Sequence, residues 1–88
     1  MTIRRPTIPV RVRLFAACAD AAGRPMLELN VVPGCTVGRL VARLRRAHAR
    51  FPTRLLIAVN QEYARRWRVL KSGDEVALLP PFSGGQST

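Results

Sequence analysis

The 88-residue sequence is poor in the side chains from which most active sites are built. It has one histidine, two cysteines and only five carboxylates, and Cys18 and Cys35 lack the spacing of a zinc site. No secretory signal accompanies the cysteines, so we expect reduced thiols. No apolar run approaches the roughly 20 residues that a membrane-spanning helix requires. These shortages argue against a metalloenzyme, a disulfide scaffold and a membrane protein, and they favour a cytoplasmic location.

Lysine is almost absent, because Lys71 is the only lysine among fifteen basic residues. The formal net charge of +10 favours an acidic partner, although a general preference for arginine in the source would explain it equally well. An alternative function is therefore a basic module that binds nucleic acid or an acidic protein. Its basic clusters would be Arg39, Arg43, Arg46 and Arg50, and Arg65, Arg66, Trp67 and Arg68. Because no base-reading motif is present, we expect no sequence-specific nucleic-acid partner.

The length allows one small domain with a thin core, which buries about 60–65% of the unfolded surface. An apolar content of 48% argues against disorder. We expect a flexible N-terminal arm at residues 1–9, where Pro6 and Pro9 restrict the chain without giving it a partner. A folded domain at residues 10–81 and a C-terminal tail at residues 82–88 would follow.

The hydrophobic pattern predicts one helix and four or five strands. Alternation predicts strands at 10–15 and 26–32, which can pair as a hairpin through a long loop. Thr36 is a candidate cap for an amphipathic helix that Pro52 would end at Phe51. A strand buried on both faces at 55–59, a turn at 60–62, a very short edge strand at 63–64 and a last strand at 76–79 complete the order. Such an α+β chain covers one sheet face with its helix, and we expect a core that includes Leu14, Leu29, Val41, Leu44, Ile57 and Val76.

The end of the sequence combines a turn, a strand, two prolines and two glycines. Gly73 can take the positive φ that a tight turn between Ser72 and Asp74 requires. Pro80 and Pro81 cannot donate a ladder hydrogen bond, so they end the strand and keep the chain extended. The pair Gly84–Gly85 has no side chain beyond Cα, so it fits a channel too narrow for other residues, although a frayed terminus is also common there.

This order of strand, Pro-Pro, spacer and Gly-Gly resembles the ubiquitin-like sulfur carriers, above all the small subunit of molybdopterin synthase (the MoaD family, a relative of the ThiS carriers). Segments 12–16 and 58–63 resemble the first and third strands of the family, and segment 73–85 resembles its terminus most closely. The resemblance implies a ubiquitin-like β-grasp fold, with a mixed four- to five-stranded sheet on one helix and the first and last strands adjacent in its middle. One departure is that the family ends at its second glycine, whereas Gln86, Ser87 and Thr88 follow Gly85 here.

The resemblance also implies a carrier without catalysis of its own. Gly85 would be adenylated by a ubiquitin-activating-type adenylyltransferase that uses ATP and magnesium, and would then carry sulfur as a thiocarboxylate for molybdenum cofactor biosynthesis. The chain itself would bind no cofactor and no metal. Its expected partners are this adenylyltransferase, the large molybdopterin synthase subunit, a sulfurtransferase and a protease that removes residues 86–88. The tail that enters the large subunit would consist of Pro80, Pro81, Phe82, Ser83 and Gly84.

Several alternatives stay open at this point. Relatives of the family serve thiamine and cysteine synthesis, and the same activation would let Gly85 modify lysines of target proteins as a protein modifier. The chain could instead be a β-grasp protein that has lost carrier duty, for which the three residues after Gly85 are the main argument. Those residues are equally compatible with proteolytic removal or with the remnant of a fusion.

Overall fold

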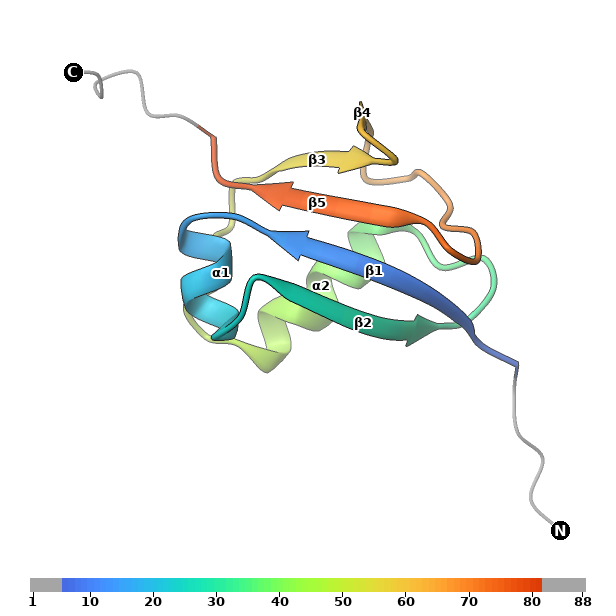
Figure 1. The fold of residues 1–88 in the computed structure, drawn as a ribbon, viewed down its shortest axis with the longest axis horizontal. Helices are drawn as coiled ribbons and strands as arrows, with labels where there is room; N and C mark the ends of the chain where they lie inside the picture. The colour runs from blue at the N-terminus through green and yellow to red at the C-terminus, as the bar shows by residue number, and fades with distance from the viewer. Residues whose placement is uncertain (1–5, 82–88) are drawn as a thin grey trace, which may run out of the picture.

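The computed structural model describes residues 6–81 as one sheet with two helices (Figure 1). The elements in order are β1 (Ile8–Leu14), α1 (Ala17–Ala22), β2 (Met26–Val31), α2 (Val37–Ala47), β3 (Leu56–Val59), β4 (Glu62–Tyr63) and β5 (Glu75–Leu79). The five strands lie in the order β2-β1-β5-β3-β4. The first and last strands are therefore neighbours inside the sheet, which confirms the predicted β-grasp arrangement.

The pairing of β1 with β5 is parallel, whereas β1–β2, β3–β5 and β3–β4 are antiparallel. In the parallel pair, Val12 lies opposite Val76 and Leu14 lies opposite Leu78. Parallel strands need a long crossover connection, and here that connection contains every other element of the domain. Because the two strands run the same way, the chain enters the sheet at one end and leaves it at the other (Figure 1).

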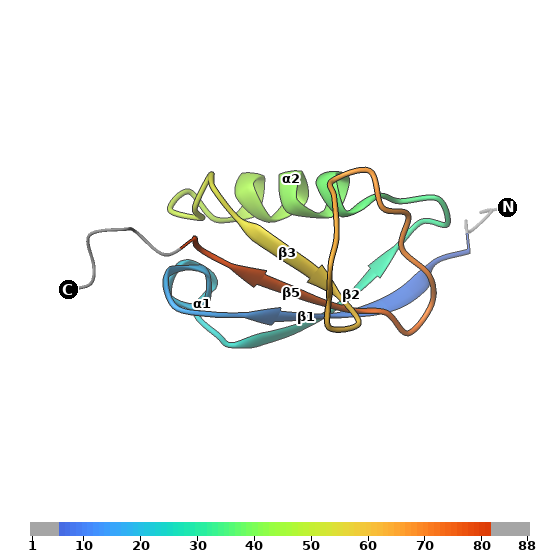
Figure 2. The ribbon, with the colours of Figure 1, turned by 90° about the horizontal axis from the view of Figure 1, so that it is seen from above.

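The core lies between α2 and one face of the sheet (Figure 2). Leu40, Val41 and Leu44 of α2 are buried against inward-facing side chains of the central strands, such as Val12, Val76 and Leu78. The predicted core residues Leu14, Val41, Leu44, Ile57 and Val76 are confirmed as buried. Leu29 was also predicted to lie in the core, but it is only partly buried and packs against the edge of the core. Leu29 lies on β2, which is an edge strand and has core neighbours on one side only.

A second helix, α1, occupies the connection that we predicted to be a long loop. Alanine, the best helix former, supplies four of its six residues. The helix ends at Gly23, which has φ of 80° and donates its N–H to the Ala19 carbonyl at 2.8 Å. Cys18, the second residue of this helix, is fully buried. The alanine run followed by a glycine is the signal that our prediction of a loop overlooked.

The start of α2 is satisfied by a cap and by a neighbouring loop. The Thr36 hydroxyl accepts from the Arg39 N–H at 3.3 Å, so the predicted cap is confirmed. The first two residues of the helix also donate backbone hydrogen bonds: the Val37 N–H to the Arg68 carbonyl at 2.9 Å, and the Gly38 N–H to the Arg66 carbonyl at 2.8 Å. A Cβ on Gly38 would lie 3.2 Å from the Arg66 carbonyl oxygen, so glycine permits this close approach.

The end of α2 comes earlier than we predicted. The helix stops at Ala47, and the N–H of His48 closes it on the Leu44 carbonyl at 2.9 Å. Phe51, the predicted last helical residue, follows in a turn but is still buried. Phe51 has the sequence spacing of the buried face of α2, but it lies in the connection between α2 and β3. This connection turns away from the helix axis to reach β3.

Two strands also differ from the prediction. The first strand starts at Ile8, two residues before the expected Val10, because it pairs with Val31 of β2. Strand β3 is buried on one face rather than on both: Ile57 is buried, whereas Leu56 is exposed. The apolar run is continuous because Leu56 is an apolar residue on the face of the sheet that α2 does not cover. Packing in the core does not explain an apolar side chain at this position.

The packing of α2 on the sheet predicts a large cost for truncating Leu44, which is buried in the middle of that contact. Leu44→Ala should lower the free energy of unfolding by about 2–5 kcal/mol, because it removes buried methyl groups and leaves a cavity. Arg45→Ala, on the exposed side of the same helix, should change it by under about 0.5 kcal/mol. Equal effects in denaturant unfolding would contradict the assigned helix face.

Candidate functional site

Strand β5 forms a rigid base for the chain that leaves the sheet. It pairs with β1 on one side and with β3 on the other, and Val76 and Leu78 are fully buried. The Phe15 N–H adds a hydrogen bond to the Leu78 carbonyl at 3.2 Å. Pro80 is half-buried and Pro81 is exposed, so the chain passes from core to solvent within these two residues. Their fixed φ angles and missing N–H groups end the β5 ladder at this point.

The face of the sheet opposite α2 carries no helix among residues 6–81 (Figure 2). In the register of β3 and β5, Ala58 lies opposite Ala77 and Leu56 lies opposite Leu79. Tyr63 of β4 lies beside Ala58, and 81% of its surface is exposed. We call these five residues the open apolar face. It adjoins Pro80 and so flanks the exit of the chain.

A shallow hollow continues the open apolar face toward the segment after β4. It is lined in part by Leu56, Tyr63, Arg65 and Trp67. Trp67 is 70% exposed, and the Arg65 guanidinium lies 5.6 Å from the centre of its ring. Tryptophan, tyrosine and arginine are the residues that most often dominate the binding energy of protein interfaces. The composition of this surface is therefore that of a docking site.

Charged residues border the open apolar face on the β1 side. Arg13 lies 3.9 Å from Glu75, and Arg11 lies 3.9 Å from Glu28, so two carboxylates flank the arginines of β1. The Arg13 guanidinium also lies 5.7 Å from the centre of the Phe15 ring. These pairs are long and partly exposed, so each contributes little to stability.

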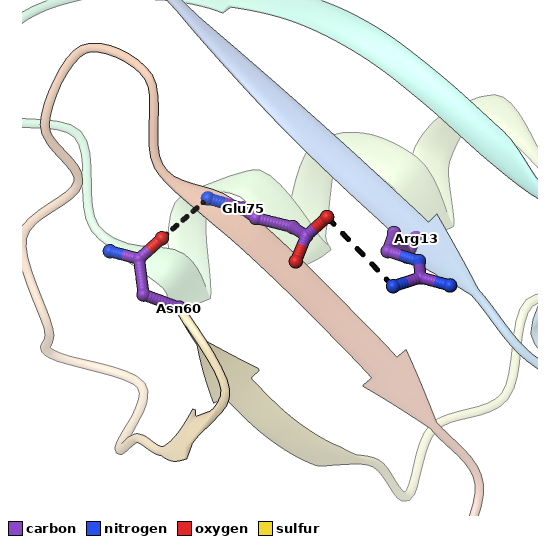
Figure 3. A network of polar contacts seen from close by, with 3 residues as sticks. All are labelled: Arg13, Asn60 and Glu75. Carbon is purple, nitrogen blue, oxygen red and sulfur yellow. Dashed lines mark hydrogen bonds and ion pairs between the residues drawn. The ribbon is translucent and has the colours of Figure 1, made fainter.

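A buried carboxylate holds the other end of β5. Asp74 is only 7% exposed; it accepts hydrogen bonds from the Asn60 side-chain amide at 2.9 Å and from the Lys71 N–H at 2.8 Å. The Asn60 side-chain oxygen in turn accepts from the Glu75 N–H at 3.0 Å, and Figure 3 shows Glu75 between Asn60 and Arg13. This network ties the β3–β4 turn to the start of β5 and so fixes where the strand begins.

The turn between β3 and β4 places Asn60 in a left-handed backbone conformation. Asn60 and Gln61 both have positive φ, 52° and 72°, as a two-residue hairpin turn requires. Asparagine tolerates this conformation better than most side chains do. The predicted turn is confirmed, but its hydrogen bond to Asp74 had no separate signal in the sequence.

The potential metal ligands and the thiols of the described residues are scattered or buried. Within residues 6–81, no three His, Cys, Asp or Glu residues are placed to hold a metal ion. Cys18 and Cys35 are buried free thiols, and burial raises the pKa of Cys18, so the reactive thiolate is disfavoured there. In the same part of the chain, neither helix is long and apolar enough to cross a membrane.

The predicted site residues fall in two groups. Pro80 and Pro81 lie at the end of β5 as expected. Phe82, Ser83, Gly84 and Gly85 lie outside the described residues. The open apolar face was not predicted from the sequence. Its signal was present in β3 and β5, where Leu56 and Leu79 make both strands apolar on their second face as well.

Comparison with known proteins finds one matching family. The ThiS family matches residues 12–85, so the match extends to Gly85. A "Molybdopterin synthase sulfur carrier subunit" from Mycobacterium tuberculosis is 39% identical over 82 residues, which cover 89% of this chain and 99% of the relative. The "Small archaeal modifier protein 1" of Haloferax volcanii is 32% identical, covering 83% of this chain and 97% of its own.

Solved structures agree with these sequence relatives. The crystal structure of the Haloferax volcanii modifier has a TM-score of 0.75 at 27% identity and covers 85% of this chain and 99% of its own. A complex of subunits 1 and 2 of the molybdopterin-converting factor from Helicobacter pylori contains a chain with a TM-score of 0.64 at 25% identity. That match covers 89% of this chain and all of the other.

The hydrogen bonds of Asp74 predict a measurable role in stability. Asp74→Ala should lower the free energy of unfolding by about 1–3 kcal/mol, because the Asn60 amide and the Lys71 N–H lose their shared acceptor. Ser72→Ala, in the exposed part of the same turn, is the matched control and should cost under about 0.5 kcal/mol. A double-mutant cycle with Asn60→Ala that gave additive losses would contradict the network.

Proposed function

Because the chain belongs to the ThiS family, we propose that it is the sulfur carrier subunit of a molybdopterin synthase. The observation that carries this proposal is the 39% identity to a sulfur carrier subunit that matches over 99% of its own length. The family match reaches Gly85, so it includes the glycine pair at which the chemistry would occur. In this role the chain is a carrier, and the catalytic groups belong to its partners.

The sulfur is carried on Gly85 as a thiocarboxylate. A carboxylate is a poor acyl donor, so its oxygen must first become a good leaving group. An adenylyltransferase that uses ATP and magnesium supplies this activation by joining the carboxylate to AMP. A sulfur nucleophile then forms the C–S bond at the Gly85 carbonyl carbon, and the C–O bond to AMP breaks. The sulfur is finally transferred to a pterin precursor within the large synthase subunit.

The structure supports this role through the path of the chain. The acyl carbon must reach a buried site on a partner, so the segment that carries it needs a fixed origin and a narrow tip. Strand β5 provides the origin, since it is hydrogen-bonded on both sides. Pro80 and Pro81 direct the chain outward, and Gly84 and Gly85 supply the narrow tip.

The large synthase subunit docks on the open apolar face beside the tail. This face adjoins Pro80 and has the exposed aromatic and aliphatic side chains that anchor protein interfaces. The related Helicobacter pylori chain is described as part of a complex of subunits 1 and 2. Phe82 follows the two prolines and would provide a further anchor on the tail.

A second candidate function is protein modification. The Haloferax volcanii relative is named a small archaeal modifier protein, and its structure matches this chain with a TM-score of 0.75. The same activated Gly85 would then form an amide with a lysine of a target protein. Mass spectrometry of lysine-linked conjugates separates the two functions, since a carrier is released after each sulfur transfer, whereas a modifier stays attached.

The proposed chemistry requires a free carboxylate on Gly85. In the 88-residue chain the Gly85 carbonyl is bonded to Gln86, so this chain should not be activated there. A chain shortened to end at Gly85 should be adenylated by the matching adenylyltransferase, as measured by ATP–pyrophosphate exchange. A Gly85→Ala version of the shortened chain is the control for the narrow tip and should be activated more slowly. Equal activation of the long and short chains would contradict the requirement for processing.

The proposed docking surface predicts the effect of one added charge. Leu56→Asp should weaken binding to the large synthase subunit by about tenfold or more, because it places a carboxylate within the apolar contact. Ala42→Asp adds the same charge on the exposed face of α2 and should change the affinity by less than about twofold. Isothermal titration calorimetry with both variants makes the comparison. Equal losses would show that charge alone, and not the open apolar face, governs binding.

A further inference from the structure

Strand β2 leaves one edge of the sheet without a neighbouring strand among the described residues (Figure 1). In its ladder with β1, residues alternate between bonding toward β1 and facing outward. The Leu14 N–H bonds to the Pro25 carbonyl, which sets the phase of this alternation. The N–H and C=O groups of Glu28 and Asn30 therefore lie on the outer edge. Such groups are a template for pairing with another extended chain.

A groove lies between this edge and α2. Its lining includes Asn30, Val32, Leu40 and three arginines of the helix face, Arg39, Arg43 and Arg46. The volume of the groove is about 230 Å³, several times the share of about 30 Å³ that a water molecule occupies in the liquid. It can therefore admit side chains as well as solvent. We call it the β2–α2 groove.

The arginines of the groove carry charge without carboxylate partners in residues 6–81. The two ion pairs described there involve Arg11 and Arg13, which lie on the other face of the sheet. Arg43 is held in place by donating to the Asn30 carbonyl at 2.9 Å, so one guanidinium is already anchored at the strand edge. The outward N–H and C=O of Glu28 and the N–H of Asn30 remain available for an added strand.

We propose that the β2–α2 groove binds an extended acidic segment of another protein by adding it as a strand to β2. The backbone of this segment pairs with Glu28 and Asn30, its aliphatic side chains contact Val32 and the apolar floor, and its carboxylates meet Arg39 and Arg46. This mode of recognition takes affinity from main-chain hydrogen bonds and specificity from alternate side chains. Guanidinium groups bind carboxylates in paired hydrogen bonds, which matches the acidic occupant.

Two features favour a protein segment over other occupants. A nucleic acid could neutralise the arginines, but it has no peptide backbone to complete a β-ladder. A second copy of the chain has that backbone, but it brings a net charge of +10 and arginines of its own to the same groove. The groove is also separate from the open apolar face, which is formed by β3, β4 and β5. An acidic segment can thus bind while the face and the tail engage another partner.

The test uses the full chain and a synthetic peptide in which four valine or isoleucine residues are followed by three aspartates. We expect saturable binding in the micromolar range, with the largest NMR shifts at the amides of Glu28 and Asn30. Arg39→Glu combined with Arg46→Glu should weaken binding at least tenfold. Arg24→Glu combined with Arg54→Glu changes the net charge equally outside the groove and should weaken it by less than threefold.

Four further measurements can overturn the proposal. A peptide N-methylated on one strand edge keeps its charge and side chains, so undiminished binding would exclude strand addition. Equal binding of a peptide with lysines in place of the aspartates would exclude the role of the arginines. A single-stranded oligonucleotide that binds the groove more tightly than the peptide would assign it to nucleic acid. Concentration-dependent shifts of the same amides without peptide would assign it to a second copy. The readout does not depend on Gly85, so failure here leaves the carrier function untouched.

Discussion

The pairing of β5 with β1 and β3 places the last strand in the middle of the sheet. It joins the last strand of the domain to the first, so it is the contact with the largest sequence separation in the sheet and closes a loop that contains every other element. It buries Val76 and Leu78 under α2 and leaves Ala77 and Leu79 on the open face. A single strand therefore holds the core, contributes to the docking surface and determines where the tail begins.

The sequence predicted the helices and strands whose apolar residues recur at a regular spacing. Alternation in β1 and β2 and the apolar stripe of α2 gave these elements correctly, and the proline pair gave the end of β5. Prediction from the sequence was weaker where the same residues are compatible with two different local structures. Alanines around Cys18 suit both a loop and a short helix, and Phe51 is buried without being helical. Asp74 gave no separate signal, because its partner Asn60 is fourteen positions away along the chain.

Charge and apolar surface are separated on this small domain. The open apolar face lies beside the exit of the tail, and the arginines of β1 that border it are paired with Glu28 and Glu75. The arginines of α2 lie on the opposite layer, where no described carboxylate pairs with them. A carrier meets several partners in turn, and distinct surfaces allow it to be held by one while it serves another. This separation also explains how a strongly basic chain can dock through a face that is mostly uncharged.

If Gly85 carries sulfur, the intact mass of the protein isolated from its native cell must show it. We expect a species that ends at Gly85 and a second that is heavier by one sulfur-for-oxygen exchange. The second should lose this added mass when the large synthase subunit and the pterin precursor are supplied. If the protein retains residues 86–88 in the cell and never gains sulfur, the carrier function is wrong.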